Sequence, residues 1–245
     1  MAAGLFAESG YFMGNNLYSA NSGNPKGIFE DDEINSINEE ILKPFAGTIP
    51  KGIKKGYKWR WLSSIPKHKE IKIKGLKQFI NKVRKKRTIK DRIKTITENK
   101  PFCFKDPRFS YTLNIWKPFL NNTIFICVFR HPSITAKSIL KEVKQNVPKK
   151  GRVPLKEKEI IEIWKNFYEY VIKNQYEEKD KWLFIHYNQF FNKKMLDKIE
   201  NFSGAEIDKD FPDEKLNKNK EPKEIPKEID KIYRKLCDLA GYEND

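Results

Sequence analysis

The chain has 245 residues and a formal net charge of +16, from 49 Lys and Arg against 33 Asp and Glu. Its length fits one α/β domain, and its 38% of hydrophobic residues can form a core, which excludes global disorder. The charge favours anionic ligands such as nucleotides or nucleic acid, although an excess of Lys spread along the chain fits a solvated surface equally well.

The chain carries no signal for crossing or entering a membrane. It has no run of about 18 apolar residues, and its first residues lack the basic start and apolar stretch of a signal peptide. Its three cysteines, Cys103, Cys127 and Cys237, do not have the spacing of metal ligands. We therefore expect no membrane segment, no metal and a cytoplasmic location, where cysteines stay reduced.

The first part of the chain is expected to be mainly helical. Small and apolar residues predict a short helix over 2–10, and a turn-rich stretch follows over 15–27. Apolar residues at helical spacing predict a helix over 30–42. The same spacing within the basic stretch 67–100 indicates an amphipathic helix with a solvated basic face.

The second part alternates short apolar runs with helical patterns. Buried parallel strands are predicted at residues 102–104, 124–129 and 182–185. Helices are predicted over 155–178 and over 225–239 before Gly241, with a polar surface loop over 211–226. This order predicts one α/β domain over 1–245, with a parallel sheet flanked by helices.

The most informative residues follow the second predicted strand. Arg130 comes directly after it, Pro132 can open the next helix, and Ser138 lies eight residues after Arg130. Ligands of open α/β sheets collect at the carboxyl ends of strands, and a guanidinium with a hydroxyl suits a phosphate. Taken alone, these residues fit better an Arg that caps a strand and a Ser that faces solvent.

Three further stretches change that ranking. They read GNPKGIFED at 23–31, KDPRF at 105–109 and WLFIHYNQFF at 182–191. Together with Arg130, Pro132 and Ser138 they resemble the sulfotransferase superfamily in order and spacing, most closely its bacterial-type members. The resemblance implies a P-loop-like parallel sheet, and 3′-phosphoadenosine 5′-phosphosulfate as co-substrate, with Arg130 and Ser138 on its 3′-phosphate.

The resemblance does not include the family's first motif. Family members begin with a strand and a loop resembling PRSGTS, which binds the 5′-phosphosulfate, and the first residues here are similar only to the helix after that loop. We therefore expect the N-terminal strand and this loop to be missing, through truncation in preference to degeneration. Whether this chain is an active enzyme stays open.

The resemblance also implies catalytic residues. Lys105 takes the place of a Lys that relatives use near the transferred group, where its charge would stabilise developing negative charge. The His that cytosolic relatives place close after this Lys is absent, so Asp106 and Glu30 are the candidate proton acceptors. The alternatives are a structural ion pair for Lys105 and a helix-capping role for Glu30.

Other basic residues are candidates for binding. Lys26 and Arg108 are expected to hold the donor or an acidic acceptor. Lys218 and Lys220 lie in a Lys-rich loop, where relatives often close over the nucleotide. Tyr187 follows the third strand and is interpreted as packing at the end of the sheet, with the adenine as the alternative contact.

The predicted function is sulfuryl transfer from this donor to an unidentified hydroxyl or amine acceptor. A first alternative is a nucleic-acid-binding protein that uses the basic stretch 74–94, with Trp59 and Trp61 for base stacking. It leaves the KDPR and RHPSITAKS stretches unexplained, so nucleic acid is the less expected partner. A second alternative is a non-catalytic family member that keeps the nucleotide site.

Overall fold

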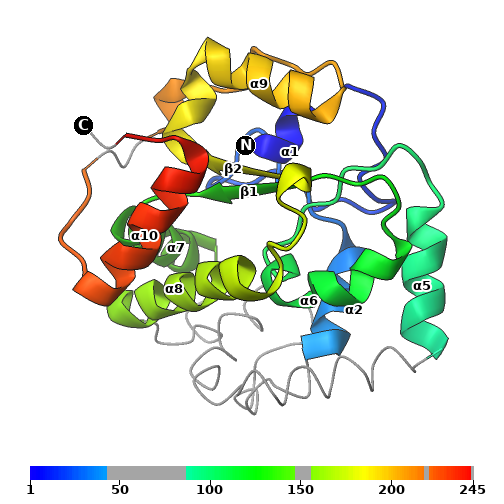
Figure 1. Cartoon of the computed structure of the whole chain (residues 1–245), viewed down its shortest axis with the longest axis horizontal. Coiled ribbons are helices and arrows are strands. Elements are labelled where there is room, and N and C mark those ends of the chain that lie inside the picture. Colours follow the sequence, from blue (N-terminus) through cyan, green and yellow to red (C-terminus); the bar gives the residue numbers. More distant parts are fainter. Residues whose placement is uncertain (43–86, 147–155, 218–220, 244–245) are drawn as a thin grey trace. The chain divides into compact units, whose positions relative to one another are not determined.

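The computed structural model describes residues 1–42, 87–146, 156–217 and 221–243 (Figure 1). Its helices and strands are, in chain order, α1 (Ala2–Leu5), α2 (Asp32–Leu42), α5 (Arg87–Thr97), α6 (Phe109–Trp116), β1 (Phe125–Phe129), α7 (Pro132–Asn146), α8 (Glu157–Asn174), β2 (Trp182–His186), α9 (Lys193–Ser203) and α10 (Lys227–Ala240). Short 3₁₀ turns are η2 (Lys117–Phe119), η4 (Lys179–Lys181), η5 (Tyr187–Phe191) and η6 (Glu214–Leu216).

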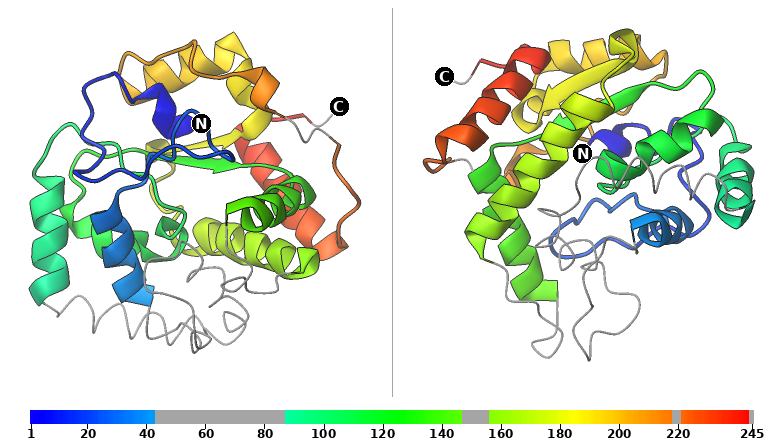
Figure 2. Two further views of the ribbon diagram at one scale, coloured as in Figure 1. Left: turned by 180° about the vertical axis from the view of Figure 1, so that it is seen from behind. Right: turned by 60° about the horizontal axis from the view of Figure 1, so that its bottom comes forward.

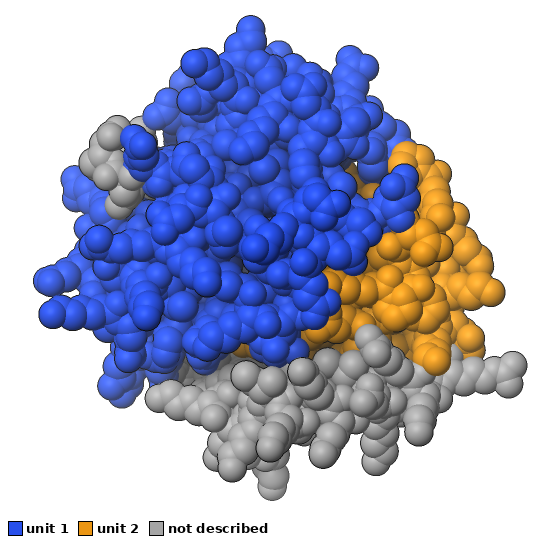
Figure 3. Space-filling model, in the orientation of Figure 1, with its two compact units in different colours: residues 1–11, 122–142, 156–245 blue, residues 12–121, 143–155 orange. Residues whose placement is uncertain are grey.

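The chain divides into two compact units (Figure 3). Unit 1 comprises residues 1–11, 122–142 and 156–245, and unit 2 comprises residues 12–121 and 143–155. Unit 1 contains both strands with α1, α8, α9, α10 and most of α7, whereas unit 2 contains α2, α5 and α6.

A parallel strand pair forms the centre of unit 1. β1 pairs with β2 in a register that runs from Phe125 opposite Trp182 to Phe129 opposite His186. Parallel strands need a long crossover, and here α7 and α8 lie between β1 and β2 in the chain. Two of the three predicted strands are thereby confirmed, and so is the α/β class with a parallel sheet flanked by helices.

Helices cover this strand pair on both sides. Figures 1 and 2 show α8 and α10 below the strands and α9 above them, and α10 packs against both β2 and α8. The helices predicted over 155–178 and 225–239 are confirmed as α8 and α10. α10 is followed by Gly241, whose φ of 58° is the left-handed conformation of a helix C-cap.

The core of unit 2 comes from α2, which packs against α5 and α6. The predicted stripe of Ile34, Ile37 and Ile41 is confirmed, because all three side chains are buried. Ile89 and Ile93 of α5 are fully buried as well. The remaining part of the predicted basic helix, before residue 87, lies outside the described residues.

A buried carboxylate starts α2. Asp31 accepts hydrogen bonds from the backbone N–H groups of Glu33 and Ile34, at 2.9 and 3.0 Å, as an N-cap residue does. Gly14 lies directly against Asp31 with a φ of 128°, and a Cβ there would meet the Asp31 side chain at 2.3 Å. The cap therefore requires glycine at position 14.

Two elements differ from the sequence predictions. Residues 102–104 form no strand in the described chain; instead Phe102 makes an isolated parallel bridge with Phe12, supported by a 2.9 Å hydrogen bond from the Cys103 N–H to the Phe12 carbonyl. The first helix ends at Leu5, and turns continue from there to Gly10. Single-domain organisation and a P-loop-like sheet stay predictions. Among the described helices, none is both long enough and apolar enough to cross a membrane.

Candidate functional site

Polar side chains gather in unit 1 where β1 and β2 end. Phe129 and His186 are the last paired residues of the two strands. Arg130 follows β1 directly, Tyr187 follows β2 directly, and α7 begins at Pro132. This is the edge at which parallel sheets bind ligands, and it includes the N-terminus of a 15-residue helix, which favours anions.

The Arg130 guanidinium lies at this edge, half-buried. It donates a hydrogen bond to the side-chain carbonyl of Asn217 and lies over the Tyr187 ring, 4.5 Å from the ring centroid. Burial lowers the pKa of Arg130 from its usual value. Because an anion beside the guanidinium would offset that cost of burial, the geometry suits a phosphate or sulfate group.

Helix α8 supports the end of β1 from below. The Trp164 indole N–H donates to the Arg130 carbonyl at 3.1 Å, and the Tyr168 hydroxyl donates to the Val128 carbonyl at 2.8 Å. These bonds satisfy the carbonyl group of Val128, near the end of β1, and that of Arg130, directly after it. They hold the backbone from which the Arg130 side chain extends.

The hydroxyl group of Ser133 lies close to Arg130 in the sequence. Ser133, in the first turn of α7, is buried, and its Oγ lies 2.9 Å from His131 Nδ1. The same Oγ accepts the Lys223 backbone N–H at 2.9 Å. The segment before α10 is thus bound to α7 through Ser133. Burial lowers the pKa of the neighbouring His131.

His186 contacts the C-terminal helix. Its ring stacks on Tyr242, with centroids 3.8 Å apart, and its Nε2 lies 3.4 Å from the Tyr233 hydroxyl of α10. Its Nδ1 accepts the Asn188 backbone N–H at 3.2 Å. Burial, with smaller contributions from the charges of Arg130 and His131, lowers the pKa of His186 to about 4. His186 is therefore neutral at ordinary pH.

The structure places the predicted nucleotide-binding residues as follows. Arg130 lies at the sheet edge, as expected. Ser138 lies on α7 with its side chain exposed, and its role in binding phosphate stays a prediction. Lys218 and Lys220 lie outside the described residues, although Asn217, directly before them, is hydrogen-bonded to Arg130.

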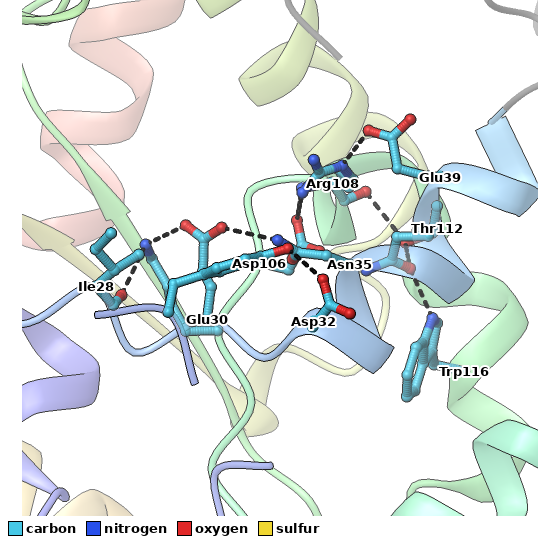
Figure 4. A network of polar contacts seen from close by, with 12 residues as sticks. Ile28, Glu30, Asp32, Asn35, Glu39, Asp106, Arg108, Thr112 and Trp116 are labelled. Carbon is cyan, nitrogen blue, oxygen red and sulfur yellow. Dashed lines mark hydrogen bonds and ion pairs between the residues drawn. The ribbon is translucent and has the colours of Figure 1, made fainter. Parts of the chain in front are cut away.

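Unit 2 contains a separate polar cluster that includes the predicted catalytic residues (Figure 4). The Lys105 ammonium donates to Glu30 Oε1 at 2.5 Å and to the Ile28 carbonyl at 3.2 Å. The second Glu30 oxygen accepts from the Asn35 side-chain amide at 3.3 Å. The ion pair that the sequence left open for Lys105 is thus present, whereas α2 is capped by Asp31 and not by Glu30.

Asp106 and Arg108 form a buried ion pair beside this cluster. Arg108 donates to Asp106 Oδ1 through Nη1 at 3.0 Å and through its backbone N–H at 2.8 Å, and its Nε donates to Glu39 at 2.9 Å. Burial raises the pKa of Asp106, against the charge of Arg108. Burial opposes the charged form of Arg108 as well, but the charges of Asp106 and Glu39 outweigh it and raise the pKa of Arg108.

Asn38 connects this ion pair to helix α6. Its side-chain NH₂ donates to Asp106 Oδ2 at 3.0 Å. Its carbonyl accepts the Thr112 hydroxyl at 2.7 Å and the Trp116 indole N–H at 2.9 Å (Figure 4). The loop that carries Lys105 is therefore held to α2 and α6 by a continuous network of buried hydrogen bonds.

This geometry bears on the roles predicted for three residues. The Asp106 side chain has no exposed surface and that of Arg108 is 3% exposed. Both therefore fit a supporting role better than direct contact with an acceptor or donor. Lys26 is exposed in the turn before Ile28. The functions predicted for all three stay predictions.

Several residues of these clusters were missed by sequence reasoning. His186 could have been found, since residues at the point where a buried parallel strand ends are expected at the ligand-binding edge, where Tyr187 was already expected. Ser133 had a comparable signal at the start of α7. Asn38 and Asn217 had none, because a single Asn in a helix or a polar loop is ordinary.

The described residues contain no group of three or more His, Cys, Asp or Glu that could hold a metal ion. Cys103 and Cys127 are free thiols, and burial raises the pKa of each to about 12. Neither thiol is therefore activated as a nucleophile.

Comparisons with known proteins give one structural likeness. No protein-family model matches the chain, and no curated protein matches its sequence. A sulfotransferase domain from the curacin biosynthetic pathway is similar over 64% of this chain and 69% of that chain, with 17% sequence identity and a TM-score of 0.45. These values assign no family to the chain.

Proposed function

We propose that this protein binds a 3′-phosphorylated adenosine nucleotide at the carboxyl end of β1 and acts as a sulfotransferase. The donor is 3′-phosphoadenosine 5′-phosphosulfate, and the acceptor is a hydroxyl or amine. The observation that carries the proposal is the position of Arg130, directly after a parallel strand and directly before the N-terminus of α7. The sequence motifs supply the identity of the nucleotide.

The residues around Arg130 suit a phosphate. The guanidinium has five N–H donors, one of which donates to the neutral amide oxygen of Asn217. The first turn of α7 adds backbone N–H groups with no intrahelical partner. A dianionic phosphate at this point would offset the burial that lowers the pKa of Arg130.

The remaining assignments of the proposal follow the sequence resemblance. Ser138, Lys218 and Lys220 are proposed to add contacts to the nucleotide. Lys105 is proposed to stabilise the negative charge that develops during transfer, and Glu30 to accept a proton from the acceptor. Glu30 is preferred to Asp106 for this role, because Asp106 is fully enclosed by its partners.

Calorimetric titration with adenosine 3′,5′-bisphosphate tests the proposal. We expect saturable binding that Arg130→Ala weakens at least about tenfold, since a hydrogen-bonded charge pair contributes roughly 1.5–3 kcal/mol. Arg234→Ala is the matched control, because it removes the same charge from an arginine whose side chain is 77% exposed on α10. Adenosine 5′-monophosphate, which lacks the 3′-phosphate, should bind about as weakly to the native protein as the bisphosphate binds to Arg130→Ala.

Two results would contradict the nucleotide site. One is equal binding of the bisphosphate by the native protein and by Arg130→Ala. The other is equal affinity for the monophosphate and the bisphosphate. If binding is as expected, incubation with the sulfate donor and simple phenol and amine acceptors separates an enzyme, which releases the bisphosphate, from a non-catalytic nucleotide-binding protein, which does not.

A further inference from the structure

The Lys105 ammonium in unit 2 is held by one short segment of chain. Its two described acceptors, the Ile28 carbonyl and the Glu30 carboxylate, lie two residues apart. Phe29, between them, has a φ of 56°, in the left-handed region that residues other than Gly, Asn and Asp rarely adopt. This unusual conformation places both oxygens on the same ammonium group, and strained residues of this kind cluster at functional sites.

The two partners of the ion pair differ in their access to solvent. The Lys105 side chain is 43% exposed, whereas that of Glu30 is 12% exposed. An ammonium group has three donors, and Glu30 and Ile28 occupy two of them. An anion from solvent can therefore approach the lysine side of the pair, while the Glu30 carboxylate is largely shielded from solvent.

Glu30 has a second partner that remains when the lysine leaves. Asn35, on the first turn of α2, donates its side-chain amide to Glu30 Oε2 at 3.3 Å and is itself buried. Figure 4 shows Glu30 between Ile28 on one side and Asn35 on the other. Helix α2 thus gives the carboxylate a hydrogen bond that does not involve Lys105.

We propose that Lys105 binds a phosphate or sulfate group of a ligand and that this exchange releases Glu30 from its ion pair. An exposed ion pair contributes little to stability, so a doubly charged oxyanion can replace Glu30 at small cost. The released carboxylate keeps its hydrogen bond to Asn35 and is then free to accept a proton from the acceptor.

This inference rests on the proposed function. In a sulfotransferase it makes the proton acceptor available only when an oxyanion is bound. It also gives a role to the ion pair between Lys105 and its candidate base. Asn35 becomes a positioning residue for Glu30.

Chemical labelling of lysines tests the exchange without any catalytic assay. The native protein is acetylated by an amine-selective reagent in chloride, in inorganic phosphate and in inorganic sulfate at equal ionic strength, and the acetylation of each lysine is read by mass spectrometry. We expect phosphate and sulfate to protect Lys105. In Glu30→Gln, which removes the competing charge, half-protection should need about threefold to fivefold less of either anion.

The chain offers a matched control pair. Lys173 and Glu169 of α8 form an ion pair of 2.6 Å on an exposed helix face. Phosphate and sulfate should not protect Lys173 as they protect Lys105, and Glu169→Gln should not make Lys173 more easily protected by either anion. Circular dichroism of both variants checks that they are folded.

The proposal is overturned if phosphate and sulfate leave Lys105 unprotected, if they protect Lys105 and Lys173 equally, or if Glu30→Gln leaves half-protection of Lys105 unchanged. These outcomes are independent of the nucleotide titration. Loss of bisphosphate binding with intact protection of Lys105 would refute the proposed function alone, and the reverse result would refute the ion-pair exchange alone.

Discussion

Units 1 and 2 each contain a partly or fully buried arginine, and the two arginines have different surroundings. Arg108 in unit 2 lies between the carboxylates of Asp106 and Glu39, whose charges raise its pKa. Arg130 in unit 1 contacts an amide oxygen and an aromatic ring, and burial lowers its pKa. A buried cation neutralised by two fixed anions is part of the scaffold, whereas a cation whose charge is disfavoured by burial gains from an anionic ligand.

The largest effect is expected from breaking the scaffold pair. Arg108→Met leaves Asp106 buried without its cation, and the free energy of unfolding should fall by roughly 3–5 kcal/mol. Urea denaturation followed by circular dichroism measures the change. The double variant Asp106→Asn with Arg108→Met should recover part of the loss, because it removes the stranded charge. A loss below about 1 kcal/mol in the single variant would show that the pair is not structural.

The next largest effect is expected in how the free energy of unfolding depends on pH, through His186 in unit 1. The folded-state pKa of His186 is about 4, below its ordinary value of 6.5, so its contribution to stability is present above pH 6.5 and is lost as the pH falls toward 4. The full difference corresponds to roughly 3 kcal/mol, of which about 2 kcal/mol should be lost between about pH 7 and pH 5.

Urea denaturation at several pH values tests this slope. His186→Gln carries no titrating ring, so its stability should change less over the same interval, even if its stability at neutral pH is lower. An equal slope in the native protein and the variant would assign the pH dependence to other groups.

The contrast between the two arginines gives a third prediction. Arg130→Met should lower the free energy of unfolding by no more than about 1 kcal/mol, because it removes a charge that burial already disfavours. The same variant should lose nucleotide binding. A destabilisation as large as that of Arg108→Met would place Arg130 in the scaffold as well.

The smallest effect is expected at the Lys105 ion pair. Glu30→Gln should change the free energy of unfolding by about 0.5 kcal/mol or less, since the Lys105 side chain is 43% exposed and such pairs contribute little. The measurement is the same urea titration, with Glu169→Gln as the control. A large loss would mean that the pair is structural and would argue against its exchange for a ligand.

Much of the fold follows from local sequence patterns. The isoleucine stripe of α2, the apolar runs of β1 and β2, and Gly241 after α10 were all read correctly, because burial of one face and a left-handed cap are local requirements. The apolar run at 102–104 misled, because a strand also needs a partner, and here only Phe102 is bridged, to Phe12.

The Arg130 and Lys105 sites show the same limit of prediction from local sequence patterns. The sequence by itself determined that Arg130 follows a buried strand and that Lys105 precedes an Asp-Pro-Arg stretch, because these are facts of order along the chain. Only the tertiary structure decided that Arg130 meets Asn217 and that Lys105 meets Glu30, 87 and 75 residues away. Hydrogen bonds and ion pairs act over a few ångströms in space, and a single sequence does not specify which distant side chains come within that range.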